Sequence, residues 1–225
     1  MATGYGQFCP VSKACEILCQ RWAMLVVREL LCGSRRFGDL QRGVPGCPPA
    51  TLSKRLRELE RAGIVDRIDD RSGPVYELTE AGHELLPVVD GLGTWAQRWV
   101  RSAYGPEDLD ADFLLWDVRR NLTPGLAAGT VVIELQVRTP APRRFWIVVD
   151  PDAVDLCLTD PQRTVDVVLS TDVRSLTEVW MGDRSWADVL ADGTVSLAGP
   201  AQLVRAIPGW FGQHPLLAPI APARA

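Results

Sequence analysis

The 225-residue chain has only two histidines, three tyrosines and three methionines, and its cationic residues do not outnumber its anionic ones. With so few histidines, a Ser-His-Asp constellation or a histidine-rich metal centre is poorly supported, and the chain has no glycine-rich phosphate loop. The sequence therefore indicates no catalytic residues, no metal ligands and no cofactor. We expect a protein that is not an enzyme.

Long apolar runs are also missing. No segment approaches the roughly 20 apolar residues that a membrane helix needs, and the start, MATGYGQFCPVSK, lacks the basic and apolar regions of a signal peptide. Six cysteines stand at irregular positions, which is typical of free thiols in a reducing compartment. These absences predict a cytoplasmic protein with no membrane partner.

The net charge of −4 is unevenly divided along the chain. Residues 1–105 hold 14 Lys and Arg against 12 Asp and Glu, whereas residues 106–225 hold 10 against 16. Within residues 35–57 there are six basic residues and one acid. Contact with phosphate requires only such a local patch. The asymmetry indicates two domains, and a break in the hydrophobic periodicity at 102–108 predicts the hinge between them, which gives domains at 1–104 and 105–225.

Residues 48–78 are the most informative segment. Leu52, Leu56 and Leu59 recur at spacings of four and three, which predicts a helix with one buried stripe. Lys54 and Arg57 fall away from that stripe. An apolar back and a small, basic front suit the major groove of double-stranded DNA.

The segment after this helix alternates like two strands. Gly63 ends the helix, and residues 64–69 and 74–78 flank a turn at 69–73 that is rich in Asp, Ser and Gly. Helix, strand, turn and strand in this order predict a winged helix-turn-helix.

Three more helices are expected around this motif. One spans 12–32 with Ser12 as its N-cap, one spans 36–42, and one spans 79–101 from a Thr79 cap. The last carries a large apolar stripe, formed by Leu85, Val88, Leu92, Trp95 and Trp99. Because Pro87, Gly91 and Gly93 weaken its intrinsic helix propensity, packing must hold this helix, and a partner subunit is the expected support.

At this point the sequence resembles the HxlR-type transcriptional regulators over about residues 8–101. The resemblance is carried by Cys9-Pro10-Val11, Arg21-Trp22, residues 30–37 (LLCGSRRF), Gly43-Val-Pro-Gly46, residues 56–60 (LRELE), Gly63-Ile-Val65, and residues 76–79 (YELT) with Gly82. It implies a homodimer that binds a pseudo-palindromic operator, and we expect it to act as a repressor.

The resemblance also implies roles for individual residues. Those expected to approach base edges or flanking phosphates are Pro49, Ala50, Thr51, Ser53, Lys54 and Arg57; those expected to contact the DNA backbone are Arg35, Arg36, Arg71 and Ser72. The plainer alternative for Lys54 and Arg57 is a solvated helix face. Arg55 lies nearer the buried stripe and is expected to pair with Glu58 or Glu60. The family usually has polar residues where this chain has Pro48-Pro49, a departure that affects base preference.

Cys9 is a candidate redox switch. Several HxlR relatives sense oxidants or electrophiles through a cysteine in this position, and a helix N-terminus stabilises a thiolate. The alternative is a small buried hydrophobe. Core packing is the better interpretation for Cys15, Cys19, Cys32 and Cys157.

In the second half, strands precede most of the helices, which predicts an α+β domain. We expect a helix at 109–122, strands at 130–137, 143–150, 153–158 and 164–170, helices at 172–181 and 185–191, a strand at 194–198 and a helix at 200–207. The complete fold class is thus α+β, a winged helix-turn-helix domain followed by a second α+β domain.

The order of elements over about 110–213 resembles sterol-carrier-protein-type-2-like domains. The carrying stretches are Val165–Leu169, Ser175–Gly182, Trp186–Leu190 and Asp192–Gly199. The resemblance implies a sheet covered by helices around an apolar cavity for hydrophobic ligands. The candidate ligand-binding residues are Trp116, Trp146, Trp180, Met181 and Trp186. The alternative is that these side chains simply fill the core.

Together these features predict a DNA-binding repressor controlled by a hydrophobic small molecule in its C-terminal domain. Three alternatives remain open: a hydrophobic-ligand carrier that uses the winged helix only for dimerisation, a regulator whose second domain is a structural dimerisation module, and a regulator switched by oxidation of Cys9.

Overall fold

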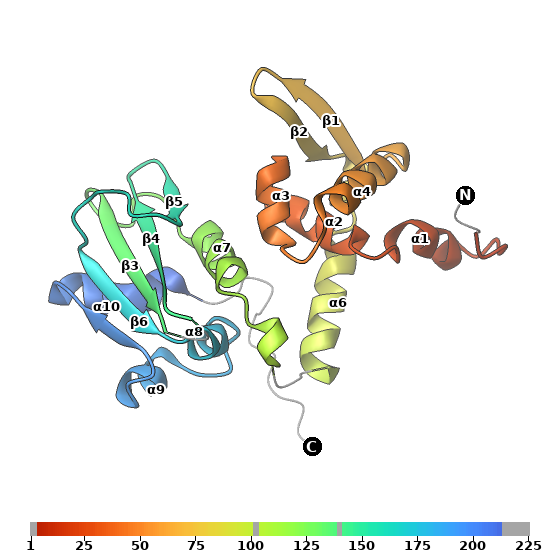
Figure 1. Ribbon diagram of the computed structural model, residues 1–225. Coiled ribbons are helices and arrows are strands. Elements are labelled where there is room, and N and C mark those ends of the chain that lie inside the picture. Colours follow the sequence, from red (N-terminus) through yellow and green to blue (C-terminus); the bar gives the residue numbers. More distant parts are fainter. Residues whose placement is uncertain (1–3, 101–103, 139–140, 213–225) are drawn as a thin grey trace. The chain divides into compact units, whose positions relative to one another are not determined.

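The computed structural model describes residues 4–100, 104–138 and 141–212 (Figure 1). The chain divides into two compact units, residues 1–97 and 98–225. Residues 102 and 103 of the expected hinge lie outside the described residues. Each unit has its own hydrophobic core. The fold is α+β, with a helix-turn-helix unit followed by a β-rich unit.

The first unit is a small helical bundle with a two-stranded wing. Its elements are α1 (Pro10–Leu18), α2 (Ala23–Leu31), α3 (Phe37–Gly43), α4 (Pro49–Arg61), β1 (Val65–Asp70), β2 (Gly73–Leu78), α5 (Glu80–His83) and α6 (Leu86–Trp99). The strands pair antiparallel, with Asp70 opposite Gly73 at the turn. Gly63 and Gly73 have φ values of +70° and +105°, which glycine adopts without strain. The expected winged helix-turn-helix is confirmed.

The single helix expected at 12–32 is wrong, because the chain breaks between α1 and α2. Trp22 lies at the break with φ +78°, a left-handed conformation that interrupts the helix. The Arg21 carbonyl oxygen accepts a hydrogen bond from Nε of Arg55 at 2.8 Å. Ser12 is not the N-cap either, since α1 begins at Pro10 with Cys9 in that position.

The single helix expected at 79–101 is also divided. Thr79 caps α5 as expected, accepting a 3.1 Å hydrogen bond from the Gly82 amide. Pro87 cannot donate a backbone hydrogen bond to the preceding turn, and its ring would clash there. The helix therefore restarts as α6 at Leu86, which places the proline in the first turn.

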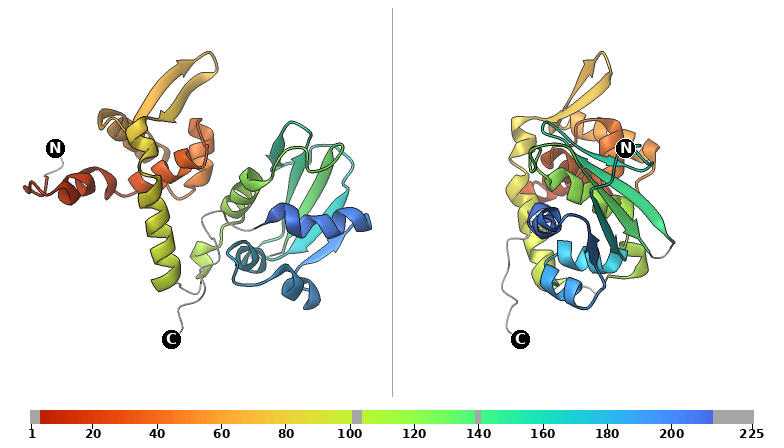
Figure 2. Two further views of the ribbon diagram at one scale, coloured as in Figure 1. Left: turned by 180° about the vertical axis from the view of Figure 1, so that it is seen from behind. Right: turned by 90° about the vertical axis from the view of Figure 1, so that its left-hand side faces the viewer.

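The second unit is a five-stranded sheet with helices on one face (Figure 2). Its elements are a 3₁₀ turn η1 (Pro106–Asp108), α7 (Ala111–Asn121), β3 (Val131–Val137), β4 (Arg143–Val149), β5 (Val154–Cys157), β6 (Val167–Thr171), α8 (Val173–Trp180), α9 (Trp186–Ala191), β7 (Ser196–Ala198) and α10 (Ala201–Phe211). The strand order is β5-β4-β3-β6-β7; β3 and β6 run parallel, and the other strand pairs that the structure describes are antiparallel.

The core of this unit lies between the sheet and its helices. Alternate strand residues face it, such as Ile133, Phe145 and Leu169, all fully buried. Because β5 and β6 lie on opposite sides of the β4–β3 pair, the chain between them must cross the sheet. Val165 of this connection packs with Trp146 in a separate small cluster on the second face. The connection therefore covers part of the face that carries no helix.

Candidate nucleic-acid interface

Helix α4 is held firmly on the first unit. Leu52, Leu56 and Leu59 are at most 1% exposed, and burying each stabilises the fold by about 1.5–3 kcal/mol. Arg55, which is only 11% exposed, pairs with Glu58 and donates to the Arg21 carbonyl. Arg55 thus fixes the helix rather than facing solvent, as its place near the stripe indicated.

The opposite face of α4 is open to solvent. Pro49, Ala50, Lys54 and Arg57 are exposed, and Thr51 and Ser53 are partly exposed. The Lys54 ammonium lies 3.9 Å from a Glu58 oxygen, a loose surface contact. Within the described residues, the Arg57 guanidinium has no ion-pair or hydrogen-bond partner. The structure thus gathers the six helix residues on one accessible, basic face.

The wing carries a second unpaired cation at its tip. The Arg71 side chain is exposed and has no partner among the residues that the structure describes, while its amide donates to Asp70 Oδ1 at 2.7 Å. The Ser72 hydroxyl is already engaged, because it donates to Asp70 Oδ2 at 2.8 Å. Arg35 is 65% exposed and lies 3.0 Å from Glu77. Arg71 is therefore the more available contact for a phosphate.

Arg36 is bound to the wing instead of pointing into solvent. Its guanidinium donates to Asp70 Oδ2 at 2.5 Å, to Ser72 Oγ at 2.7 Å and to the Gly73 carbonyl at 2.6 Å. The hydrogen bonds from Arg36 and Ser72 lower the pKa of Asp70 to about 2. Asp70 is therefore ionised and paired at neutral pH.

Cys9, the candidate redox thiol, stands at the N-cap of α1, the position that the sequence had assigned to Ser12. Its carbonyl accepts a 3.1 Å hydrogen bond from the Lys13 amide, and the residue is partly exposed. Cys47 directly precedes α4's first turn and is buried, which raises the pKa of its thiol. Core packing is wrong for Cys19, which is exposed, whereas Cys15, Cys32 and Cys157 are partly buried.

The five candidate ligand-binding residues of the second unit do not form one group. Trp180, Met181 and Trp186 pack into the same core beneath α8 and α9. Trp146 lies on the opposite face of the sheet. Trp116 is buried on α7 beneath the Arg119 guanidinium, which lies 5.3 Å from the ring centroid. Three of the five residues therefore share a location.

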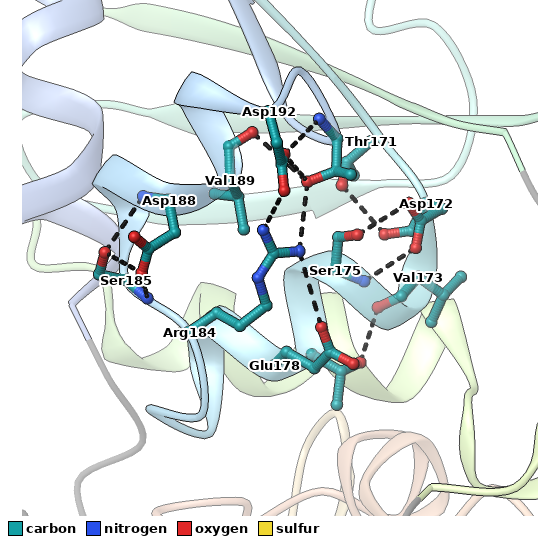
Figure 3. A network of polar contacts seen from close by, with 12 residues as sticks. Thr171, Asp172, Val173, Ser175, Glu178, Arg184, Ser185, Asp188, Val189 and Asp192 are labelled. Atoms are coloured by element: carbon teal, nitrogen blue, oxygen red, sulfur yellow. Dashed lines mark hydrogen bonds and ion pairs between the residues drawn. The ribbon is translucent and has the colours of Figure 1, made fainter.

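Polar contacts fix the loop between Trp180 and Trp186 (Figure 3). Arg184 bridges from this loop to Asp192 and, at 3.9 Å, to Glu178. Ser185 and Asp188 form a capping box at the start of α9, with an Asp188 amide to Ser185 Oγ distance of 3.1 Å. The Trp186 ring meets Phe211 edge to face at 5.7 Å between centroids.

Sequence reasoning missed Asp117, which anchors Trp180. The Trp180 indole N–H donates to Asp117 Oδ2 at 2.9 Å, and Arg120 pairs with Oδ1 at 2.5 Å. Both ionic side chains are at most 10% exposed. The spacing of three between Asp117 and Arg120 was the available signal, since residues at that spacing are neighbours on a helix.

A protein whose exposed basic helix follows a helical turn and precedes a two-stranded wing is a winged helix-turn-helix DNA-binding protein. Comparison with known proteins agrees: residues 17–104 match the family model described as HxlR-like helix-turn-helix. The chain is 37% identical over 102 residues to the HTH-type transcriptional regulator YvaP of Bacillus subtilis. The aligned residues are 44% of this chain and 94% of that relative. This chain belongs to the HxlR family and is a DNA-binding transcriptional regulator.

Other relatives match the same part of the chain. The HTH-type regulator Mb3122 of Mycobacterium bovis is 40% identical over 99 residues, which are 43% of this chain and 62% of that protein. A structure of reduced YodB from B. subtilis covers 44% of this chain and all of that chain, with 29% identity and a TM-score of 0.38.

The comparison also returned a structure of sterol carrier protein 2 from Yarrowia lipolytica. It covers 48% of this chain and 93% of that chain, with 13% identity and a TM-score of 0.36. In the part of the chain that the structure describes, no helix is long and apolar enough to cross a membrane.

Proposed function

We propose that this regulator binds a pseudo-palindromic operator as a homodimer and represses transcription until a hydrophobic small molecule occupies the second unit. The observation that supports the DNA-binding geometry is the pair of exposed cations, Arg57 on α4 and Arg71 on the wing, whose side chains have no partner among the residues that the structure describes. A recognition helix and a wing side by side allow base contacts and phosphate contacts from one surface.

The homodimer is supported by α6, which has little core of its own. Val89 is its one buried residue among those described. Val88, Leu92, Trp95 and Trp99 lie along one side of the helix and are 45–64% exposed. A continuous apolar stripe of this kind marks an interaction surface. A second copy of the chain buries it symmetrically and spaces two α4 helices for two half-sites.

Control by a ligand is supported by the aromatic group under α8–α10. The Trp186 indole nitrogen is buried, and among the described residues it has no hydrogen-bond partner. Leaving a buried donor unpaired costs about 1–3 kcal/mol, so an acceptor on an apolar ligand stabilises the site. Trp180 and Met181 remain proposals for the same site as Trp186, whereas Trp116 packs against Arg119 and Trp146 lies across the sheet.

An Arg57→Ala variant is expected to bind operator DNA about 5- to 150-fold more weakly, which corresponds to about 1–3 kcal/mol for one specific contact. Its stability should change little, because an exposed and unpaired side chain supports no packing. Fluorescence anisotropy with the duplex upstream of the gene measures the affinity. Lys13→Ala is the matched control: it removes the same charge from α1, and equal losses in both variants would contradict a contact by Arg57.

Effector control is tested by adding a panel of apolar ligands to the operator complex in reducing buffer. Release by a ligand, and loss of that release in Trp186→Phe, support the second unit as the sensor. Loss of DNA binding on oxidation alone, abolished in Cys9→Ser, would instead assign the switch to Cys9. A carrier that uses its winged helix only for dimerisation would show no salt-dependent binding to this duplex.

A further inference from the structure

The wing carries several acidic residues, although the proposed function brings it close to DNA. Strand β1 carries Asp66, Asp69 and Asp70 within five residues. Carboxylates facing phosphates repel them, and the repulsion reduces affinity. Two of the three are neutralised by arginines: Arg67 lies 2.7 Å from Asp69, and Arg36 lies 2.5 Å from Asp70.

Arg36 reaches the wing from outside it, across 34 residues of sequence. It is the N-cap residue of α3, and its guanidinium meets a carboxylate, a hydroxyl and a carbonyl of the turn at once. A backbone hydrogen bond also connects the start of α3 to the wing, because the Tyr76 amide of β2 donates to the Arg35 carbonyl at 2.9 Å. A planar guanidinium with five donors can serve three such acceptors in one fixed geometry.

The same contacts leave Arg36 poorly placed to meet DNA. Its side chain is 38% exposed, against 65% for the neighbouring Arg35. To reach a phosphate it would have to leave Asp70, which would release the turn and restore an unpaired negative charge on the wing. Arg71, by contrast, lies beside the clamped residues and has no side-chain partner in the described part of the chain.

We propose that Arg36 is a positioning residue of the DNA-binding surface: it clamps the wing turn to α3 and neutralises Asp70, so that Arg71 is presented to a DNA phosphate. This proposal rests on the proposed function and assigns different roles to Arg36 and Arg71. Arg36 acts through Arg71 and contacts no DNA itself.

A double-mutant cycle separates positioning from direct contact. Arg71→Ala is expected to reduce the slope of log affinity against log salt by about one, the value for one lost phosphate contact. Arg36→Ala is expected to reduce the affinity for DNA at least as much as Arg71→Ala does. The double variant is expected to bind no more weakly than Arg36→Ala alone. Additive losses, with a slope reduced by about two in the double variant, would overturn the proposal. Arg35→Ala combined with Arg71→Ala is the matched control, and its losses are expected to add.

Hydrogen exchange of the full-length protein without DNA tests the clamp independently. Amides of β1 and β2 are expected to exchange faster in Arg36→Ala, and also in Arg36→Lys, because an ammonium cannot bridge the three acceptors in the same plane. Unchanged exchange in both variants would refute the clamp. If the wild-type protein shows no salt-dependent DNA binding, the proposed function fails, whereas the exchange result still reports whether the clamp exists.

Discussion

Trp95→Asp is expected to convert the protein into a monomer and to weaken operator binding by about a hundredfold or more, because linked half-site contacts gain a factor of 10²–10⁴. Trp95 is 57% exposed within one copy, so its replacement should leave the stability of the monomer nearly unchanged. In a symmetric interface the new carboxylate is buried twice, each time without a partner. Sedimentation equilibrium measures the assembly, and anisotropy measures the affinity.

Thr94→Asp provides the control for this experiment. Thr94 is exposed on the same helix but lies about 100° around the axis from Trp95. The Thr94→Asp substitution introduces the same charge beside the apolar stripe instead of within it, so the dimer should persist. A Trp95→Asp protein that remains dimeric and binds the operator normally would refute α6 as the dimer surface.

Much of the first unit could be predicted because its signals are local. The spacing of Leu52, Leu56 and Leu59 indicated α4 and its buried side, and Gly63 and Gly73 marked backbone conformations that other residues avoid. Hydrophobic periodicity could not reveal the break at Trp22, because the apolar stripe continues on both sides of it. The hydrogen bond from Arg55 to the Arg21 carbonyl joins residues 34 positions apart.

The residues of the candidate site divide in the same way. The exposure of Lys54 and Arg57 follows from helix geometry, so their side of α4 could be predicted; their contact with DNA stays a prediction. The role of Arg36 depends on the folded position of a turn that lies 34 residues away, which no local pattern records. In the second unit, the alternation of side chains along β4 already places Trp146 on the opposite face of the sheet from Phe145 and Ile147. The sequence prediction grouped the tryptophans by residue type and did not use this alternation.

Asp117→Ala is expected to lower the free energy of unfolding of the second unit by about 3–5 kcal/mol, the cost of removing one partner from a buried ion pair. The Arg120 guanidinium, 10% exposed, would lose its carboxylate, and the Trp180 indole would lose the acceptor that joins α8 to α7. Asp117→Asn should be milder, because an amide oxygen can still accept from Trp180. Urea unfolding followed by tryptophan fluorescence measures the effect, with a separate transition for each unit where they unfold independently.

Asp112→Ala is the matched control, since Asp112 lies on the same helix and pairs with Arg143 on β4. Both side chains of that pair are more than 40% exposed, and solvent-exposed pairs contribute about 0–1 kcal/mol. The contrast between the two variants tests whether burial, rather than pairing itself, makes Asp117 important. Equal destabilisation by both substitutions would refute Asp117 as the anchor of Trp180. A large loss confined to Asp117→Ala would mean that the buried Asp117 carboxylate, and not ion pairing on α7 in general, holds Trp180 of α8 against α7.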